Sequence, residues 1–381
     1  MSSIYLDHNA TTSLDSRVLD VMLPWMQHQS GNPTSRHVFG RSARTAIEHA
    51  RAQVAEACGA YPSQVIFTSC GTEANNFAVK GITATQEAAQ ILYSAIEHPC
   101  VSRPAQALRQ HGFKSQAIAV NPQGKLDKAH LQQLLDQPTN LVSVMLANNE
   151  TGVIQDIAEI AELAKRHGSF MHTDAVQGLG KLSLSFTDLN VHAMTVSSHK
   201  IHGPQGAAAL ILDKRVDIQP LLHGGGQEKG LRSGTENIAA IVGFGKACEL
   251  AAANVNHFAS HAQRLRDQFE QGLQSLNVTI FGNEAARIPN TSFFAVPGIE
   301  GETLVMALDR KGFAVASGSA CSSDSTEPSH VLLAMGVGHD LARGAVRVSF
   351  GSHNTEQHVA DFLAALKNEI SRLRQLTGIA A

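Results

Sequence analysis

The sequence has little of what marks several specialised classes of protein. Its 381 residues include one tryptophan, and its 30 basic and 33 acidic side chains nearly balance, for a net charge of −3. This near-neutral charge argues against a nucleic-acid partner, because dedicated nucleic-acid binders carry a basic field. No apolar run approaches the ~18 residues of a membrane span, so no membrane partner is expected. The first residues lack a signal-peptide pattern, and we expect a cytoplasmic protein.

Cysteine is also scarce, with five residues at scattered positions. An odd number of cysteines cannot all pair within one chain, and cytoplasmic thiols stay reduced. The five thiols are therefore either inert core residues or include one reactive thiol. They are Cys58, Cys70, Cys100, Cys248 and Cys321.

What the sequence does have is a regular alternation of short apolar runs with amphipathic stretches. Residues 157–167 form one such stretch, with Ile157, Ile160, Ala161 and Ala164 at helical spacing. This rhythm predicts an α/β fold with a mostly parallel sheet covered on both faces. The expected strands are 65–68, 91–94, 116–120, 141–146, 169–173, 193–197 and 207–212.

The pattern changes near residue 257, where a smaller α+β unit is expected. We predict a large domain over 15–256 and a small domain formed by 1–14 and 257–381. The elements expected in the small domain are a helix over 264–276, strands over 290–296 and 345–350, and a helix over 355–373.

Two glycine-rich segments resemble nucleotide-binding loops but lack their required residues. In the segment that ends at Lys181, Ala175 stands where a phosphate loop needs its first glycine, and Leu182 replaces the Ser or Thr. The glycines after His223 do not follow a strand. The chain has no C-x-x-C or H-E-x-x-H pattern, and we expect no metal site.

A lysine follows one of the expected strands. Lys200 comes three residues after the strand that ends at Ser197 and shortly before a Gly-Pro pair. A lysine held there is well placed to form a Schiff base with an aldehyde cofactor. Ser197 and His199 could donate hydrogen bonds to a phosphate. The alternative is an ordinary exposed loop lysine.

An aspartate follows the preceding strand. Asp174 could pair with the protonated nitrogen of a pyridine ring, or it could simply cap a helix. Since ligands of parallel sheets gather beyond the carboxyl ends of the strands, Asp174 and Lys200 are expected at the same edge.

Three more strands end in residues of the same character. Gly71 and Thr72 open a helix whose free amides suit a phosphate, His98 could stack on a flat ring, and Asn149 lies in a turn. Helix capping, a loop histidine and turn chemistry explain each feature singly. They explain poorly why the features follow strands in succession.

Together these segments resemble the cysteine desulfurases, pyridoxal phosphate (PLP) enzymes of fold type I in the class V aminotransferase group. The resemblance covers nearly the whole chain and predicts a three-layer αβα large domain with a seven-stranded sheet. The matching segments are Tyr5–Thr12, Gly31–Pro33, Phe67–Glu73, Glu97–Pro99, Ala147–Gly152, His172–Gln177, Ser198–Lys200, Arg232–Glu236, Ser317–Cys321, Glu327–His330 and Val346–Phe350.

The resemblance also implies roles for single residues. Lys200 would bind PLP covalently and move the Cα proton of the substrate. Asp174 would pair with the pyridine nitrogen of the cofactor, and Gln177 would bind its phenolic oxygen. His98 would stack on the ring and assist proton transfer. The phosphate would be held by Gly71, Thr72, Ser197 and His199. Thr235 matches a threonine that reaches the phosphate of the second subunit, which implies a homodimer. Arg347 and Asn149 would bind the substrate carboxylate.

Cys321 lies in a run of small and polar residues, which suits a reactive thiol better than a core one. The resemblance implies that it takes the sulfur of L-cysteine as a persulfide, leaves L-alanine, and passes the sulfur to an acceptor protein. Iron–sulfur cluster assembly, transfer-RNA thiolation, DNA phosphorothioation and cofactor sulfuration remain open as pathways. The alternatives are a selenocysteine lyase, another class V aminotransferase, or a non-catalytic sulfur-relay protein.

The sequence departs from the family pattern at a few positions. Ala316 and Ser322 replace a serine and a threonine beside Cys321, and Ser352 and His353 replace an arginine and an aromatic residue. The short C-terminus puts docking of an iron–sulfur scaffold protein in doubt.

Overall fold

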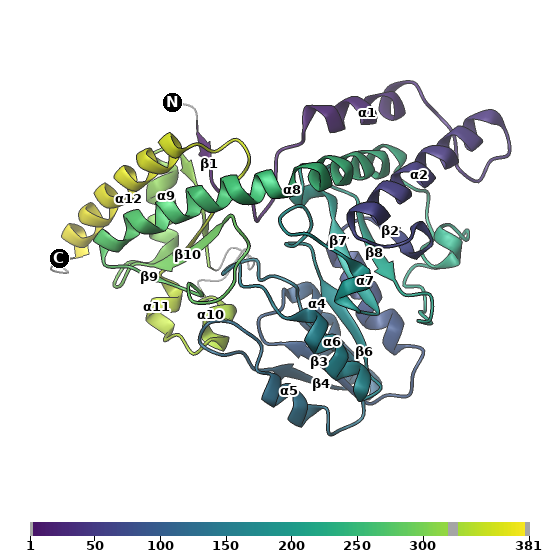
Figure 1. Cartoon of the computed structure of the whole chain (residues 1–381), viewed down its shortest axis with the longest axis horizontal. Coiled ribbons are helices and arrows are strands. Elements are labelled where there is room, and N and C mark those ends of the chain that lie inside the picture. The colour runs from purple at the N-terminus through teal and green to yellow at the C-terminus, as the bar shows by residue number, and fades with distance from the viewer. Residues whose placement is uncertain (1–2, 319–326, 378–381) are drawn as a thin grey trace.

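The computed structural model of the chain describes residues 3–318 and 327–377 and has two lobes (Figure 1). The larger lobe is built on a seven-stranded sheet and the smaller on a four-stranded one. The strands of the large sheet, in spatial order, are β2 (Val65–Thr68), β8 (Ala208–Leu212), β7 (Ala193–Ser197), β6 (Phe170–Asp174), β5 (Thr139–Ser143), β3 (Gln90–Ser94) and β4 (Lys114–Ile118).

The large sheet is parallel except at one strand. Strand β8 runs antiparallel to both of its neighbours, β2 and β7, whereas all the other pairs are parallel. Only a short connection separates β8 from β7, too short for the crossover that a parallel pair requires. Strand β5 ends at Ser143 rather than at the predicted Leu146, although the Leu146 amide still donates to the Asp174 carbonyl oxygen over 2.9 Å.

Helices cover both faces of this sheet, as the alternation of its side chains requires. In β8, Ala209 and Ile211 pack into one core, and Leu210 and Leu212 pack into the core on the opposite face. The helices of this lobe are α1 (Ser16–Gln27), α2 (Val38–Ala57), α3 (Gly71–Asn76), a π-helical turn (Phe77–Gly81), α4 (Pro99–Ala107), α5 (Lys128–Leu134), α6 (Ile157–Arg166), α7 (Phe186–Leu189) and α8 (Ile238–Leu273).

The smaller lobe is an antiparallel sheet packed between helices. In β10 of this sheet, Phe293 and Phe294 point into different cores on its two faces. The sheet has the order β12 (Ala316–Ser317), β13 (Ala345–Ser349), β10 (Thr291–Ala295) and β9 (Thr279–Ile280). A separate pair joins β1 (Ile4–Tyr5) to β11 (Phe313–Ala314), and the helices are α9 (Gly301–Asp309), α10 (His330–Ala334), α11 (His339–Arg343) and α12 (Glu356–Thr377).

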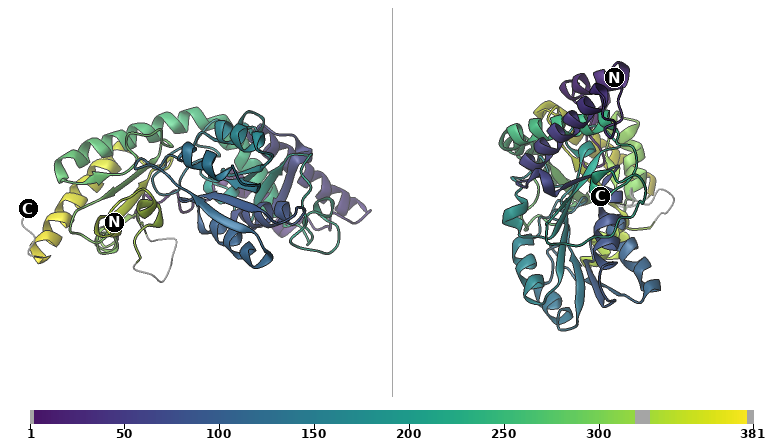
Figure 2. Two further views of the ribbon diagram at one scale, coloured as in Figure 1. Left: turned by 90° about the horizontal axis from the view of Figure 1, so that it is seen from below. Right: turned by 90° about the vertical axis from the view of Figure 1, so that its right-hand side faces the viewer.

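Helix α8 joins the two lobes. It is continuous from Ile238 to Leu273, so the helix predicted from residue 264 begins much earlier. Figure 1 and the left view of Figure 2 show it lying across both lobes. By length and composition alone it could also cross a membrane, which is weak evidence because buried core helices meet the same criterion. Its residues Phe244 and Phe269 are fully buried in the cores of the two lobes.

The predicted boundary at residues 256 and 257 falls inside this continuous helix. The division into a large and a small domain therefore stays a prediction, although the core clusters follow the two sheets. The architecture itself confirms the expected α/β fold with a seven-stranded, mostly parallel sheet and a smaller α+β unit.

Candidate active site

The candidate site lies at the carboxyl ends of the parallel strands. Asp174 is the last residue of β6, and Lys200 ends a 3-10 turn (Ser198–Lys200) that directly follows β7. Because β6 and β7 are parallel neighbours, both side chains reach the same edge of the sheet. His98 follows β3 and caps α4. The side chains that the strand pattern placed at one edge of the sheet therefore meet there.

These side chains border a cavity of about 320 Å³. Two larger cavities, of about 480 and 390 Å³, lack the aspartate and the histidine, although Lys200 also borders the smaller of them. The residues that line the candidate site are Asn9, Ala10, Cys70, Gly71, Thr72, Asn75, His98, Cys100, Met145, Ala147, Asn149, Asp174, Val176, Gln177, Ser197, His199, Lys200 and Arg347.

The carboxylate of Asp174 is buried and held at both oxygens. The Val176 amide donates to Oδ1 over 2.9 Å, and Asn75 Nδ2 donates to Oδ2 over 2.6 Å. Glu97 lies nearby, and its pKa is raised well above the usual value by burial and by the charge of Asp174. Asp174 is the acidic residue that lines the cavity, and the raised pKa of Glu97 disfavours a second negative charge beside it.

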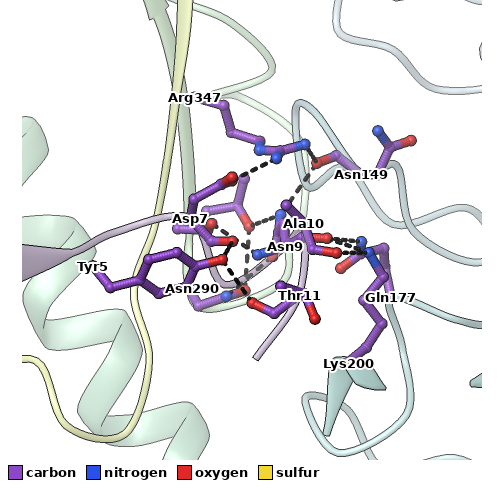
Figure 3. Close-up of polar contacts among 12 residues, drawn as sticks. Tyr5, Asp7, Asn9, Ala10, Thr11, Asn149, Gln177, Lys200, Asn290 and Arg347 are labelled. Carbon is purple, nitrogen blue, oxygen red and sulfur yellow. Dashed lines mark hydrogen bonds and ion pairs between the residues drawn. The ribbon is translucent and has the colours of Figure 1, made fainter. Parts of the chain in front are cut away.

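The amine of Lys200 is held by the N-terminal segment. Its Nζ donates to the carbonyl oxygens of Asn9 and Ala10, each over 2.6 Å (Figure 3). Gln177 Nε2 donates to the same Asn9 carbonyl over 2.9 Å. These contacts aim both side chains at one end of the cavity.

Donors around a glycine form a further part of the cavity lining. A Cβ at Gly71 would lie 3.3 Å from Val176 Cγ2, so the backbone approaches closely there. Ser197 Oγ is buried without a hydrogen-bond partner in the described part of the chain. The pKa of His199 is lowered to about 4 by burial and by Lys200, so the ring is neutral. An anion beside Ser197 would supply the hydrogen-bond partner that its hydroxyl lacks among the described residues.

Arg347 reaches the cavity from the smaller lobe. It lies on β13 between β12 and β10, is 4% exposed, and donates to Asp7 over 2.7 Å and to the Asn149 carbonyl oxygen over 2.9 Å (Figure 3). Its Nε has no partner among residues 3–318 and 327–377. An unused guanidinium donor in a buried site suits a carboxylate ligand.

Thr235 and the cysteines take several different positions. Thr235 is exposed and does not line this cavity. Cys321 is outside the described residues. Cys58 and Cys248 are buried in the core of the larger lobe, whereas Cys70 and Cys100 line the cavity. Over the described residues, no group of three or more His, Cys, Asp or Glu side chains is arranged to hold a metal ion.

Comparison with known proteins decides the family. The family model described as "Aminotransferase class-V" matches residues 4–362. "Cysteine desulfurase 2" of Trichormus variabilis is 41% identical over 380 residues, which cover 99% of this chain and 95% of that protein. The chain belongs to the cysteine desulfurase family.

Solved structures of desulfurase-like proteins share the fold. A "NIFS-LIKE PROTEIN" is 38% identical and superposes with a TM-score of 0.91, over 97% of this chain and 100% of that one. The structure named "SspA in complex with cysteine" is 31% identical with a TM-score of 0.82, over 92% and 99% of the two chains. These likenesses confirm the predicted family and its fold type I architecture.

The structure adds residues to this desulfurase-family site that motif reading did not single out. Asp7 pairs with Arg347, and Asn9 accepts at its Oδ1 from the buried Lys181 over 2.8 Å. Lys181 also donates to Gln177 Oε1 over 2.5 Å. The only sequence signal was that Asp7 and Asn9 lie in a matching segment. Lys181 appeared only in a failed phosphate-loop pattern.

Proposed function

We propose that this chain is a PLP-dependent cysteine desulfurase that converts L-cysteine to L-alanine and carries the sulfur as a persulfide on Cys321. The observation that supports it best is the cavity that brings Lys200, Asp174 and His98 together beside Arg347. A non-catalytic relay protein has no need of this combination.

The residues present fit the cofactor that enzymes of this family use. Asp174 would hold the pyridine nitrogen, Gln177 the phenolic oxygen, and His98 would stack on the ring. The phosphate would lie at Gly71, Thr72, Ser197 and His199, where the Ser197 hydroxyl lacks a partner in the described chain. When bound, PLP supplies an electron sink for the bond changes at the substrate.

The contacts of Gln177 fix which end of its amide faces the cofactor. The Asn9 carbonyl oxygen can only accept, so Nε2 is the end that faces it, and Oε1 accepts from Lys181. One hydrogen of Nε2 goes to the Asn9 carbonyl oxygen, and the second is left to donate to a phenolic oxygen. The amide therefore presents a donor to the cavity.

Lys200 would have two tasks in the reaction. Its Nζ would carry the cofactor covalently and then take the proton from the substrate Cα. The Asn9 and Ala10 carbonyls that hold Nζ now would keep the amine close once it is released. The ion pair between Asp7 and Arg347 gives the guanidinium a counter-ion when the substrate carboxylate is absent.

L-cysteine would bind through its carboxylate at Arg347, with Asn149 beside it. In the sulfur-transfer step the Cys321 thiolate attacks the substrate sulfur, so that an S–S bond forms as the C–S bond breaks. The carbon fragment keeps the electron pair and takes up protons to become alanine. A thiol on the acceptor protein then removes the outer sulfur.

The assembly and location belong to the same proposal. The exposed position of Thr235 is compatible with reaching the cofactor phosphate of a second copy in a homodimer. We also propose a cytoplasmic enzyme that delivers sulfur to a protein acceptor, whose identity decides the pathway.

Two substitutions test the function. Lys200→Ala should abolish the visible absorbance of lysine-bound PLP, whereas Lys246→Ala, at a half-buried position of α8 outside the cavity, should keep it. Cys321→Ala should keep the absorbance and lose sulfide release from L-cysteine, with Cys70→Ala as the matched thiol control. Full sulfide release by Cys321→Ala would refute the persulfide step. A higher alanine yield from selenocysteine than from cysteine would favour a selenocysteine lyase instead.

A further inference from the structure

Cys100 is a thiol in the cavity for which the proposed reaction has no use. It follows His98 by two residues at the start of α4, and its sulfur lies 2.9 Å from His98 Nδ1. The same sulfur accepts from Asn75 Nδ2 over 3.0 Å. Cys100 therefore stands between His98 and the amide that holds Asp174.

The direction of each hydrogen bond in this chain follows from Asp174. Its carboxylate oxygen accepts from Asn75 Nδ2, so the amide nitrogen of Asn75 is the atom that also faces Cys100. The second amide hydrogen is donated to the sulfur. The thiol hydrogen of Cys100 is then left to point at His98 Nδ1.

A second contact independently indicates that Nδ1 of His98 is a hydrogen-bond acceptor. The backbone amide of Cys100 donates to His98 Nδ1 over 3.2 Å. A backbone amide can only donate, so Nδ1 carries no proton in the neutral ring. The proton of His98 is therefore on Nε2.

We propose that Cys100 is a positioning residue whose thiol donates to His98 Nδ1 and holds the neutral imidazole with its proton on Nε2. The role of His98 in proton transfer rests on the proposed function, but the state of the ring does not. Protonation of Nδ1 would break the bonds from both the thiol and the backbone amide. Cys100 therefore favours a neutral His98 that presents a donor to the cavity.

The groups around His98 shift its pKa in both directions. Burial lowers its pKa, the charge of Asp174 raises it, and Lys200, His330 and Arg103 lower it. Burial and the charge of Asp174 raise the pKa of Glu97, beside it in the chain, which disfavours a further negative charge there. Burial and the charge of Asp174 also raise the pKa of the Cys100 thiol, so that it keeps the hydrogen it donates and does not compete as a nucleophile.

The test measures the protonation of His98 directly, by ¹⁵N NMR of the imidazole in the PLP-loaded protein, with the signal assigned by its loss in His98→Gln. The wild type should show a protonated Nε2 and an unprotonated Nδ1. Cys100→Val fills the volume without a donor, and the pKa of His98 should rise by about 0.7, the effect of one ordinary hydrogen bond.

Two variants separate the donor from packing. Cys100→Ser restores a donor and should keep the low pKa of His98, and Cys70→Ala removes the other cavity thiol and should leave it unchanged. An unchanged pKa in Cys100→Val, or a protonated Nδ1 in the wild type, would overturn the inference. Neither result depends on sulfide release, so a failure here is distinct from a failure of the desulfurase proposal.

Discussion

Replacing Glu228 by glutamine should destabilise the protein by about 3–5 kcal/mol, the cost of breaking a buried ion pair at one partner. Glu228 forms a bidentate pair with Arg51, with both contacts at 2.7 Å. The two side chains are only 2% and 7% exposed. The glutamine variant would leave the guanidinium charged, buried and without its main counter-ion.

The magnitude follows from how fully both groups are engaged. Glu228 also accepts from the Phe67 amide over 2.9 Å, and Arg51 also donates to the Val65 carbonyl oxygen over 2.9 Å. The pair thus ties strand β2 to the loop that carries Thr235. Glu48, the second acid near Arg51, is largely exposed and offers only weak compensation.

Urea unfolding at fixed protein concentration measures this loss, with Arg51→Met and the double variant completing a mutant cycle. Arg51→Met alone should also be destabilising, because it leaves the carboxylate buried without its guanidinium partner. The double variant should be less destabilised than the sum of the single variants, since it buries no unpaired charge. A loss below about 1 kcal/mol for Glu228→Gln, or simple additivity, would refute the reasoning.

Three shorter predictions concern the cavity and the core. Arg347→Lys should raise the KM for L-cysteine at least about tenfold, because one charge-assisted hydrogen bond contributes roughly 1.5–3 kcal/mol, while the PLP absorbance persists; steady-state kinetics would show an unchanged KM if the role is wrong. Gly71→Val should weaken PLP binding because its side chain would press on Val176, whereas exposed Gly338→Val should leave it intact, as a PLP titration would measure. Burial lowers the pKa of His172 from 6.5 to about 3, so the unfolded chain binds a proton that the folded one refuses, and stability falls as the pH drops below about 6.5. Urea unfolding should show about 2 kcal/mol of this loss at pH 5, and His172→Gln should show a shallower decline.

The sequence could predict which strand ends carry the chemistry because parallel strands bring their carboxyl ends to one edge. Lys200, Asp174 and His98 were therefore expected together, and they line one cavity. The reversed direction of β8 could not be predicted, since apolar periodicity is the same in parallel and antiparallel strands.

Contacts between distant segments were beyond such reasoning. Asp7 meets Arg347 across 340 positions of sequence, and Asn9 meets Lys181 across 172. No local pattern encodes these distances. Lys181 in particular looked like part of a failed loop motif, whereas the structure ties it by hydrogen bonds to Asn9 and Gln177.

The early start of α8 was missed for a different reason. Its first half is rich in alanine and glycine, which weakens the contrast between apolar and polar faces on which helix prediction depends.

The continuity of α8 has a consequence for how the molecule comes apart. Phe244 and Cys248 belong to the core of one lobe, and Leu265, Phe269 and Leu273 to the core of the other. If the helix frayed from either end, one hydrophobic core would lose the side chains that α8 contributes to it. The remaining helix, which packs in the other core, would be shorter. The two lobes should thus unfold in one cooperative transition. A chain cleaved near residue 256 should not give two lobes that each stay folded on their own.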